Sequence, residues 1–120
     1  MKNLFSCLFL LLMLGASPLA EAEPNDQGKT AARATLMTRQ LAQKTQLSEG
    51  QYVKVRQLNM RLLTEVQALQ TRLAAEPAAL DKQLAELQSH YEWDLATILW
   101  PRQMAVYTQS KADLMAFSIR

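Results

Sequence analysis

A proline between two leucine-rich stretches is the feature that most limits how this chain can fold. Pro77 lacks a backbone N–H and pushes Glu76 out of helical geometry, so it breaks a helix there and suits the first turn of the next one. On each side of Pro77, apolar residues recur at steps of three and four, the spacing of a helix that packs along one face. These residues are Val55, Leu58, Leu62, Val66, Leu69 and Leu73 before the proline, and Leu80, Leu84, Leu87, Tyr91, Leu95 and Ile98 after it. The pattern predicts two helices, at 49–75 and 78–99, folded back as an antiparallel hairpin.

Two further helices are expected to flank this hairpin. Residues 29–46 place Ala34, Met37 and Leu41 on one helical face. Pro101 separates the hairpin from a last helix at 102–117, whose apolar positions are Met104, Tyr107, Leu114 and Met115. Because no stretch alternates with a period of two for long enough to form a strand, we predict an all-α fold of three to four helices.

The length of the second helix predicts an elongated molecule. At 1.5 Å per residue it spans roughly 40 Å. A compact domain the size of residues 23–120 has a radius of gyration of about 12.6 Å, and therefore a diameter of about 33 Å. The hairpin is longer than that, so part of its apolar seam is expected to stay open, and a homodimer is expected to cover it.

The N-terminal residues resemble a secretory signal peptide. Lys2 precedes an apolar run at 4–14, and Ala20 and Ala22 form an A-x-A cleavage site. The run falls short of the roughly 20 residues that span a bilayer. We therefore predict a signal peptide at 1–22, a disordered lead-in at 23–28 and one helical domain at 29–120, with no stable membrane insertion after cleavage. An uncleaved anchor is the alternative.

Cysteine content and charge bear on the cellular compartment of the protein and on the kind of partner it binds. The single cysteine, Cys7, lies within the predicted signal peptide, so the mature chain has no thiol for a disulfide, a metal or a nucleophile. Export without disulfides fits the bacterial periplasm. Residues 29–72 carry eight basic and two acidic residues, a net +6, whereas 76–94 carry one basic and five acidic, a net −4. Either the two helices attract each other, or a basic surface receives acidic or unfolded partners.

Two similar pentapeptides open the second and last helices. The first is Leu47-Ser-Glu-Gly-Gln51 and the second is Leu99-Trp-Pro-Arg-Gln103, 52 residues further on. In a capping box, a serine side chain accepts the N–H of the third helical residue, and a glutamine there accepts the N–H of the cap. Ser48 can act in this way, but Trp100 has no side-chain oxygen with which to cap.

This pair of motifs resembles the Spy/CpxP (LTXXQ-motif) family of small helical periplasmic proteins. The resemblance rests on Leu47, Ser48, Gln51, Leu99, Pro101 and Gln103, covers about residues 30–117, and departs from the family pattern at Trp100. It implies an ATP-independent chaperone with a cradle-shaped dimer, which binds unfolded or stressed envelope proteins. The alternatives are an inhibitor of the periplasmic domain of one envelope-stress sensor kinase, a metal-responsive envelope protein, or a purely structural hairpin.

A client surface and a metal site can be assigned only as candidates. The client surface would combine cations with apolar side chains, namely Arg56, Met60, Arg61, Trp93 and Trp100. Trp100 has two interpretations, a side chain buried at the hairpin end or an exposed contact. Glu86, His90 and Asp94 share a helical face, but one histidine and two carboxylates on one helix cannot surround an ion. We expect no cofactor, no enzyme activity and no nucleic-acid binding.

Overall fold

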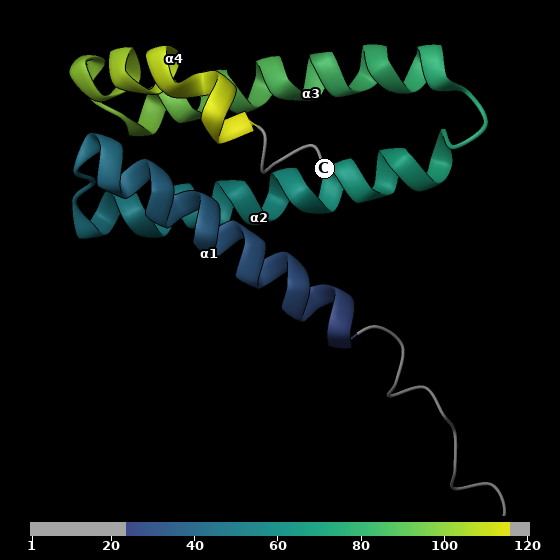
Figure 1. Ribbon diagram of the computed structural model, residues 1–120, viewed down its shortest axis with the longest axis horizontal. Helices are drawn as coiled ribbons and strands as arrows, with labels where there is room; N and C mark the ends of the chain where they lie inside the picture. The colour runs from purple at the N-terminus through teal and green to yellow at the C-terminus, as the bar shows by residue number, and fades with distance from the viewer. Residues whose placement is uncertain (1–23, 116–120) are drawn as a thin grey trace, which may run out of the picture.

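The computed structural model describes residues 24–115, and its ordered elements are four helices with no strand among these residues (Figure 1). The predicted all-α class is confirmed. The helices are α1 (Pro24–Thr45), α2 (Glu49–Arg72), α3 (Pro77–Ile98) and α4 (Pro101–Met115). The predicted signal peptide at 1–22 lies outside the described residues.

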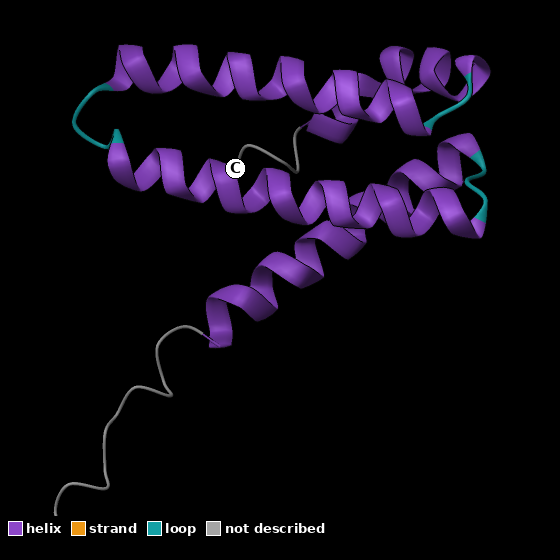
Figure 2. Cartoon of the chain, turned by 180° about the vertical axis from the view of Figure 1, so that it is seen from behind, coloured by secondary structure: helices purple, strands orange, loops and turns teal. Residues whose placement is uncertain are grey.

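The central hairpin is formed by α2 and α3, which run antiparallel side by side (Figure 1). Pro77 is the first residue of α3, and Glu76 before it has a φ of −129° and a ψ of 72°, outside the helical region, as predicted. The second helix ends three residues earlier than expected, because the backbone N–H of Glu76 bonds to the carbonyl of Leu73, 3.0 Å away, and closes a turn. Figure 2 shows this turn at the opposite end of the molecule from the other two loops.

The first helix begins earlier than the sequence indicated. It starts at Pro24, so the prediction of a disordered lead-in was wrong for residues 24–28. A proline suits the first position of a helix, where its missing N–H has no intrahelical partner to lose. The polar residues after it are typical of turns, but an acidic residue in the first turn of a helix is also stabilised by the helix dipole.

The core lies in the half of the hairpin away from the turn, where α1 packs on α2, α4 packs on α3, and α1 and α4 also touch. Its apolar members are Ala34, Met37, Leu41, Val55, Leu58, Leu62, Leu63, Val66, Tyr91, Leu95, Leu99, Tyr107 and Leu114. Towards the turn, the predicted seam is only half-buried, at Leu69, Leu73, Leu80, Leu84 and Leu87. Among residues 24–115, this part of the seam is therefore covered less completely than the core, as expected.

A chain of polar side chains crosses this core and joins three helices. The Tyr91 hydroxyl of α3 donates to Oδ1 of Asn59 on α2, 2.6 Å away. Nδ2 of Asn59 donates to Oγ1 of Thr38 on α1 at 2.9 Å, and Thr38 Oγ1 donates to the Ala34 carbonyl at 2.7 Å. Asn59 is 1% exposed, so these bonds replace water that it has lost.

Stability is expected to fall in alkali because of the buried tyrosines. Burial, and then the negative charge of nearby groups including Glu92, raises the pKa of Tyr91 and Tyr107 above the ordinary value of 10.0. The folded state thus holds these protons more tightly than the unfolded state, so stability is fully present below pH 10 and declines as the pH rises past it. Urea unfolding between about pH 9 and pH 11 should show this decline.

The Tyr91→Phe and Tyr107→Phe variants provide the control for this titration. Each lacks one ionisable hydroxyl, so each should lose part of the alkaline slope, whatever its stability at neutral pH. An unchanged slope in both variants would assign the alkaline effect to other groups.

Candidate functional site

The two predicted motifs meet at one end of the bundle, which we call the motif end, where α2 and α4 both begin (Figure 1). The N–H of Gln51 donates to Oγ of Ser48 at 3.2 Å, and the N–H of Ser48 donates to Oε1 of Gln51 at 3.0 Å. This reciprocal pair confirms the capping box predicted at the start of α2.

The start of α4 carries half of the same arrangement. The N–H of Trp100 donates to Oε1 of Gln103 at 2.9 Å, as the N–H of Ser48 does to Gln51. The return bond is chemically impossible, because an indole has no acceptor oxygen. Pro101 is the first residue of α4, as its fixed φ favours.

The two motif glutamines also bond to each other. Nε2 of Gln51 donates to Oε1 of Gln103 at 2.7 Å, and Nε2 of Gln103 donates to Oε1 of Gln51 at 3.1 Å. Both side chains are buried. Amides that pair reciprocally satisfy a donor and an acceptor on each side, which is what a buried polar group needs.

Each glutamine also reaches the loop that precedes the other helix. Gln51 Nε2 donates to the Ile98 carbonyl at 3.1 Å, and Gln103 Nε2 lies 3.3 Å from the Gln46 carbonyl and 3.2 Å from that of Thr45. Ile98 and Gln46 each lie two residues before the capping position. The motif end is therefore pseudo-twofold symmetric, and it ties the α1–α2 loop to the α3–α4 loop.

The other motif residues support this junction. Leu99 is buried in the core, and Leu47 is half-buried against it. Gln46 adopts a φ of 57°, and its N–H donates to the Ala42 carbonyl at 2.8 Å, so it ends α1 in the left-handed conformation typical of a helix C-terminus. The sequence indicated two helix caps 52 residues apart, but it did not indicate that the capping side chains touch.

Replacing Trp100 by threonine is expected to stabilise the protein by about 1 kcal/mol, the usual value of a side-chain cap. Threonine Oγ1 would accept the N–H of Gln103 and complete the second capping box. For a chain of this size, the melting temperature should rise by about 4–8 °C, measured by circular dichroism.

The matched control for this prediction is Trp93→Thr. Trp93 lies inside α3 and is also highly exposed, so its replacement removes a similar surface but offers no cap. It should not raise the melting temperature. A Trp100→Thr variant that melts no higher than the parent would show that the indole stabilises the fold in another way.

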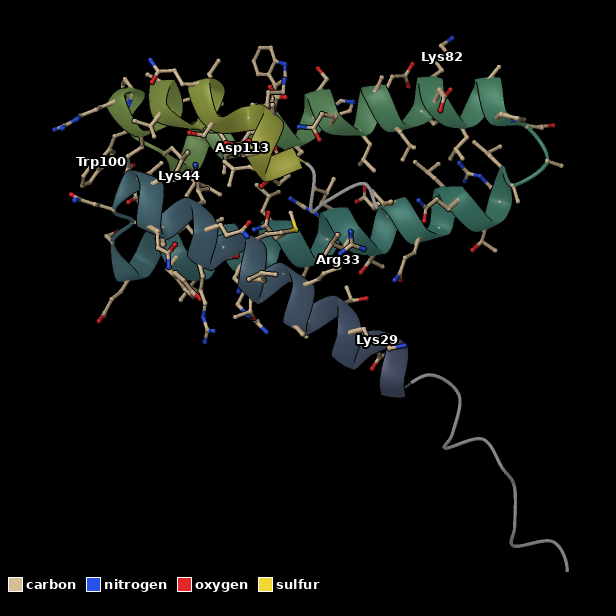
Figure 3. All side chains as sticks on the ribbon, viewed as in Figure 1. Lys29, Arg33, Lys44, Lys82, Trp100 and Asp113 are labelled. Atoms are coloured by element: carbon tan, nitrogen blue, oxygen red, sulfur yellow. The ribbon has the colours of Figure 1, made fainter. Side chains whose placement is uncertain are left out.

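The predicted client-surface residues differ in exposure and in their contacts. Arg56 is half-buried and its Nε donates to Oγ1 of Thr35 at 3.0 Å, and Met60 packs against the core. Arg61 is exposed and pairs with Asp94 across the hairpin at 3.4 Å. Trp93 and Trp100 are 75% and 62% exposed, so the interpretation of Trp100 as buried is wrong. Figure 3 shows Trp100 at the motif end.

The candidate metal ligands are divided between different contacts. Asp94 pairs with Arg61, whereas Glu86 and His90 line a hollow nearer the hairpin turn. Within residues 24–115, no three histidine, cysteine or acidic side chains are grouped so that they could hold a metal ion. None of the helices in that range is both long and apolar enough to cross a membrane.

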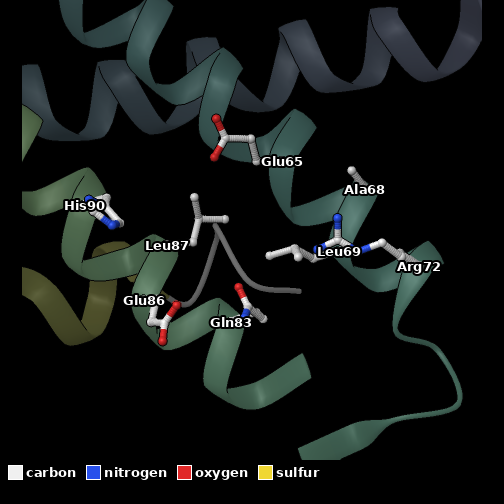
Figure 4. Close-up of a pocket in the computed structure, with 8 residues that line it drawn as sticks. All are labelled: Glu65, Ala68, Leu69, Arg72, Gln83, Glu86, Leu87 and His90. Atoms are coloured by element: carbon white, nitrogen blue, oxygen red, sulfur yellow. The ribbon is translucent and has the colours of Figure 1, made fainter. Parts of the chain in front are cut away.

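Besides a hollow of about 350 Å³ at the Arg61–Asp94 pair, two hollows lie nearer the two ends of the hairpin. The first, which we call the hairpin hollow, lies between α2 and α3 and has a volume of about 320 Å³ (Figure 4). Leu69 and Leu87 face it together with charged side chains of both signs, Glu65, Arg72 and Glu86. The second, the end hollow, has a volume of about 220 Å³ and lies at the motif end beside Trp100.

Comparison of the chain with models of known protein families, with curated proteins and with solved structures finds no match. The fold and the motif end define an all-α protein in which two capping glutamines close a helical hairpin. Any closer relationship therefore depends on the motifs themselves.

Proposed function

We propose that this chain is a periplasmic, ATP-independent chaperone-like protein of the Spy/CpxP type, which binds unfolded or stressed envelope proteins. The observation that carries the proposal is the open half of the hairpin. There, five leucines of the seam are only half-buried, although two of them, Leu84 and Leu87, also touch the core. Partly exposed apolar surface that is continuous along a groove supports a binding role.

The arrangement favours weak and reversible binding. Apolar contact contributes about 25 cal/mol per Å² buried, so a client side chain that is half-covered by the seam gains only about 1 kcal/mol. The free energies of several such contacts along the hairpin add up, and they do not require the precise shape complementarity of an interface with a single folded partner. An unfolded chain, which presents apolar side chains at irregular intervals, is the partner that such a surface fits.

Charge supports the same partner class. The stretch at 29–72 has a net charge of +6 and supplies the exposed cations of α1 and α2. The Arg61–Asp94 pair is solvent-exposed on both sides, so it contributes at most about 1 kcal/mol and can open to meet a client. Positive potential of this kind steers acidic chains towards the protein, and salt weakens it.

The cellular setting belongs to the same proposal. The signal-like residues 1–22 support export, and the absence of cysteine after Cys7 suits a periplasmic chain. A homodimer that covers part of the open seam, so that a second copy and a client compete for it, is part of the proposal.

The test is aggregation of a chemically unfolded model protein, with and without purified residues 23–120, without ATP, at low and high salt. Suppression near equal stoichiometry that weakens with salt is the expected result. The Leu69→Ser/Leu87→Ser variant should lose much of it, whereas Val53→Ser, an exposed apolar position at the other end of α2, should not.

Failure to suppress aggregation at several-fold excess would contradict the chaperone function. In that case, a single saturable partner recovered from envelope extract would indicate the sensor-kinase inhibitor.

A further inference from the structure

We infer that the end hollow binds a protein segment that presents a carboxylate next to an apolar or aromatic side chain. The inference rests on the proposed function and deepens it, because it names a class of client segment and a place, apart from the hairpin seam, that would select it.

The floor of the end hollow is polar but already satisfied. Thr45 and Gln46 line it, and their backbone carbonyls both accept from Nε2 of Gln103. These bonds belong to the glutamine pair that closes the motif end, so the two carbonyls already have a hydrogen-bond donor. Recognition of a ligand is therefore left to the side chains around the rim, which are Lys44, Trp100, Arg102 and Val106.

The rim is positively charged. Lys44 comes from the last turn of α1 and Arg102 from the first turn of α4, and both are exposed. No carboxylate lines the end hollow, in contrast to the hairpin hollow, where Glu65 and Glu86 accompany Arg72. Two cations without an acidic neighbour favour an anionic group, and arginine can hold a carboxylate through two parallel hydrogen bonds.

Trp100 supplies the apolar half of the recognition. Its position is one where serine or threonine would cap α4, and the indole there contributes no cap and is 62% exposed. Tryptophan and arginine are the residues that contribute most to protein interfaces. An apolar or aromatic side chain of the ligand can lie against the indole while the neighbouring carboxylate reaches Arg102 and Lys44.

The experiment uses the mature chain with the substitution Trp93→Phe, which leaves Trp100 as the only tryptophan and hence as the fluorescent probe. It is titrated with an acetylated, amidated pentapeptide that contains phenylalanine followed by two glutamates. A matched peptide has glutamines in place of the glutamates. We expect a saturable change in Trp100 emission, with at least about tenfold weaker binding of the glutamine peptide, since hydrogen bonds to a charged carboxylate are stronger than those to a neutral amide.

A pair of variants tests the rim. Lys44→Gln/Arg102→Gln should abolish the preference for the acidic peptide while its circular dichroism spectrum stays helical. The control Arg39→Gln/Lys82→Gln removes the same charge from exposed positions outside the hollow and should keep the preference. Equal affinity for the two peptides, or equal losses in the two double variants, would overturn the inference.

The outcomes also separate this inference from the proposed function. Suppression of aggregation that survives Lys44→Gln/Arg102→Gln in the absence of peptide selectivity would refute the acidic-segment site and leave the chaperone intact. Selective peptide binding without any suppression of aggregation would support the acidic-segment site and refute the chaperone function. A Trp100 emission shift that follows protein concentration alone, together with a dimer in sedimentation, would mean that the hollow receives a second copy, and the inference would be wrong.

Discussion

Replacing Gln103 by alanine is expected to lower the free energy of unfolding by about 3 kcal/mol, because each buried polar group left without a partner costs about 1–3 kcal/mol. Gln103 accepts the N–H of Trp100 and donates towards Gln51 and the carbonyls of the α1–α2 loop. Without the Gln103 side chain, the Trp100 N–H, the Gln51 amide and the two loop carbonyls would each lose a hydrogen-bond partner at the motif end. Urea unfolding followed by circular dichroism measures the effect.

Gln109→Ala is the matched control for this substitution. Gln109 lies on the same helix, α4, but is exposed, so the same change in side chain should alter stability by less than about 0.5 kcal/mol. If Gln103→Ala were as mild as Gln109→Ala, the glutamine pair would be dispensable for stability.

A double-mutant cycle isolates the bond between the two glutamines. Gln51→Ala and Gln103→Ala should each be costly alone, whereas the double variant should cost less than their sum, because the second substitution removes a group that the first had already left unpaired. A coupling energy of about 1 kcal/mol or more is expected. Strict additivity would indicate that each glutamine acts only as a local cap.

The second large effect is expected at the polar chain in the core. Asn59→Leu keeps a similar volume but leaves the Tyr91 hydroxyl without its acceptor and Thr38 without a donor. The expected loss is about 2–4 kcal/mol in the free energy of unfolding, because both stranded groups are buried. Thermal and urea unfolding should agree on the direction.

Replacing all three hydrogen-bonded side chains in the core by apolar ones provides the decisive comparison. Adding Tyr91→Phe and Thr38→Val to Asn59→Leu removes every stranded group with little change of shape, and such replacements are often nearly neutral. The triple variant should therefore recover much of the stability that Asn59→Leu alone has lost. If it were even less stable than Asn59→Leu, the loss would have to come from packing and not from unsatisfied hydrogen bonds.

The helical fold was predictable because its signals are local. Pro77 and the two leucine seams specify the hairpin, and Ser48 with Gln51 specifies the start of α2. The prediction failed at the start of α1, where Pro24 and the polar residues after it are compatible with both a loop and a first helical turn. A local pattern cannot separate these two states, since packing decides between them.

The contacts that define the motif end were not predictable in the same way. The sequence predicts a local capping role for Gln51 and for Gln103, and nothing in either pentapeptide indicates a partner 52 residues away. Asn59 likewise lies beside the seam position Leu58 and gives no sign that it bonds to both neighbouring helices. Trp100 was open to two interpretations, because its exposure depends on how closely α1 approaches the start of α4.

The separation along the chain between the glutamines has a consequence for the order of folding. Contacts of the α2–α3 hairpin near its turn join residues that are close in sequence, so the entropy of closing that loop is small and the hairpin can form early. The glutamine pair closes 52 residues and the bond from Gln103 to Thr45 closes 58, so these contacts should form after the main barrier. In stopped-flow experiments, replacing Gln103 should then mainly raise the unfolding rate and leave the folding rate nearly unchanged. The glutamine pair would thus determine the kinetic lifetime of the native bundle.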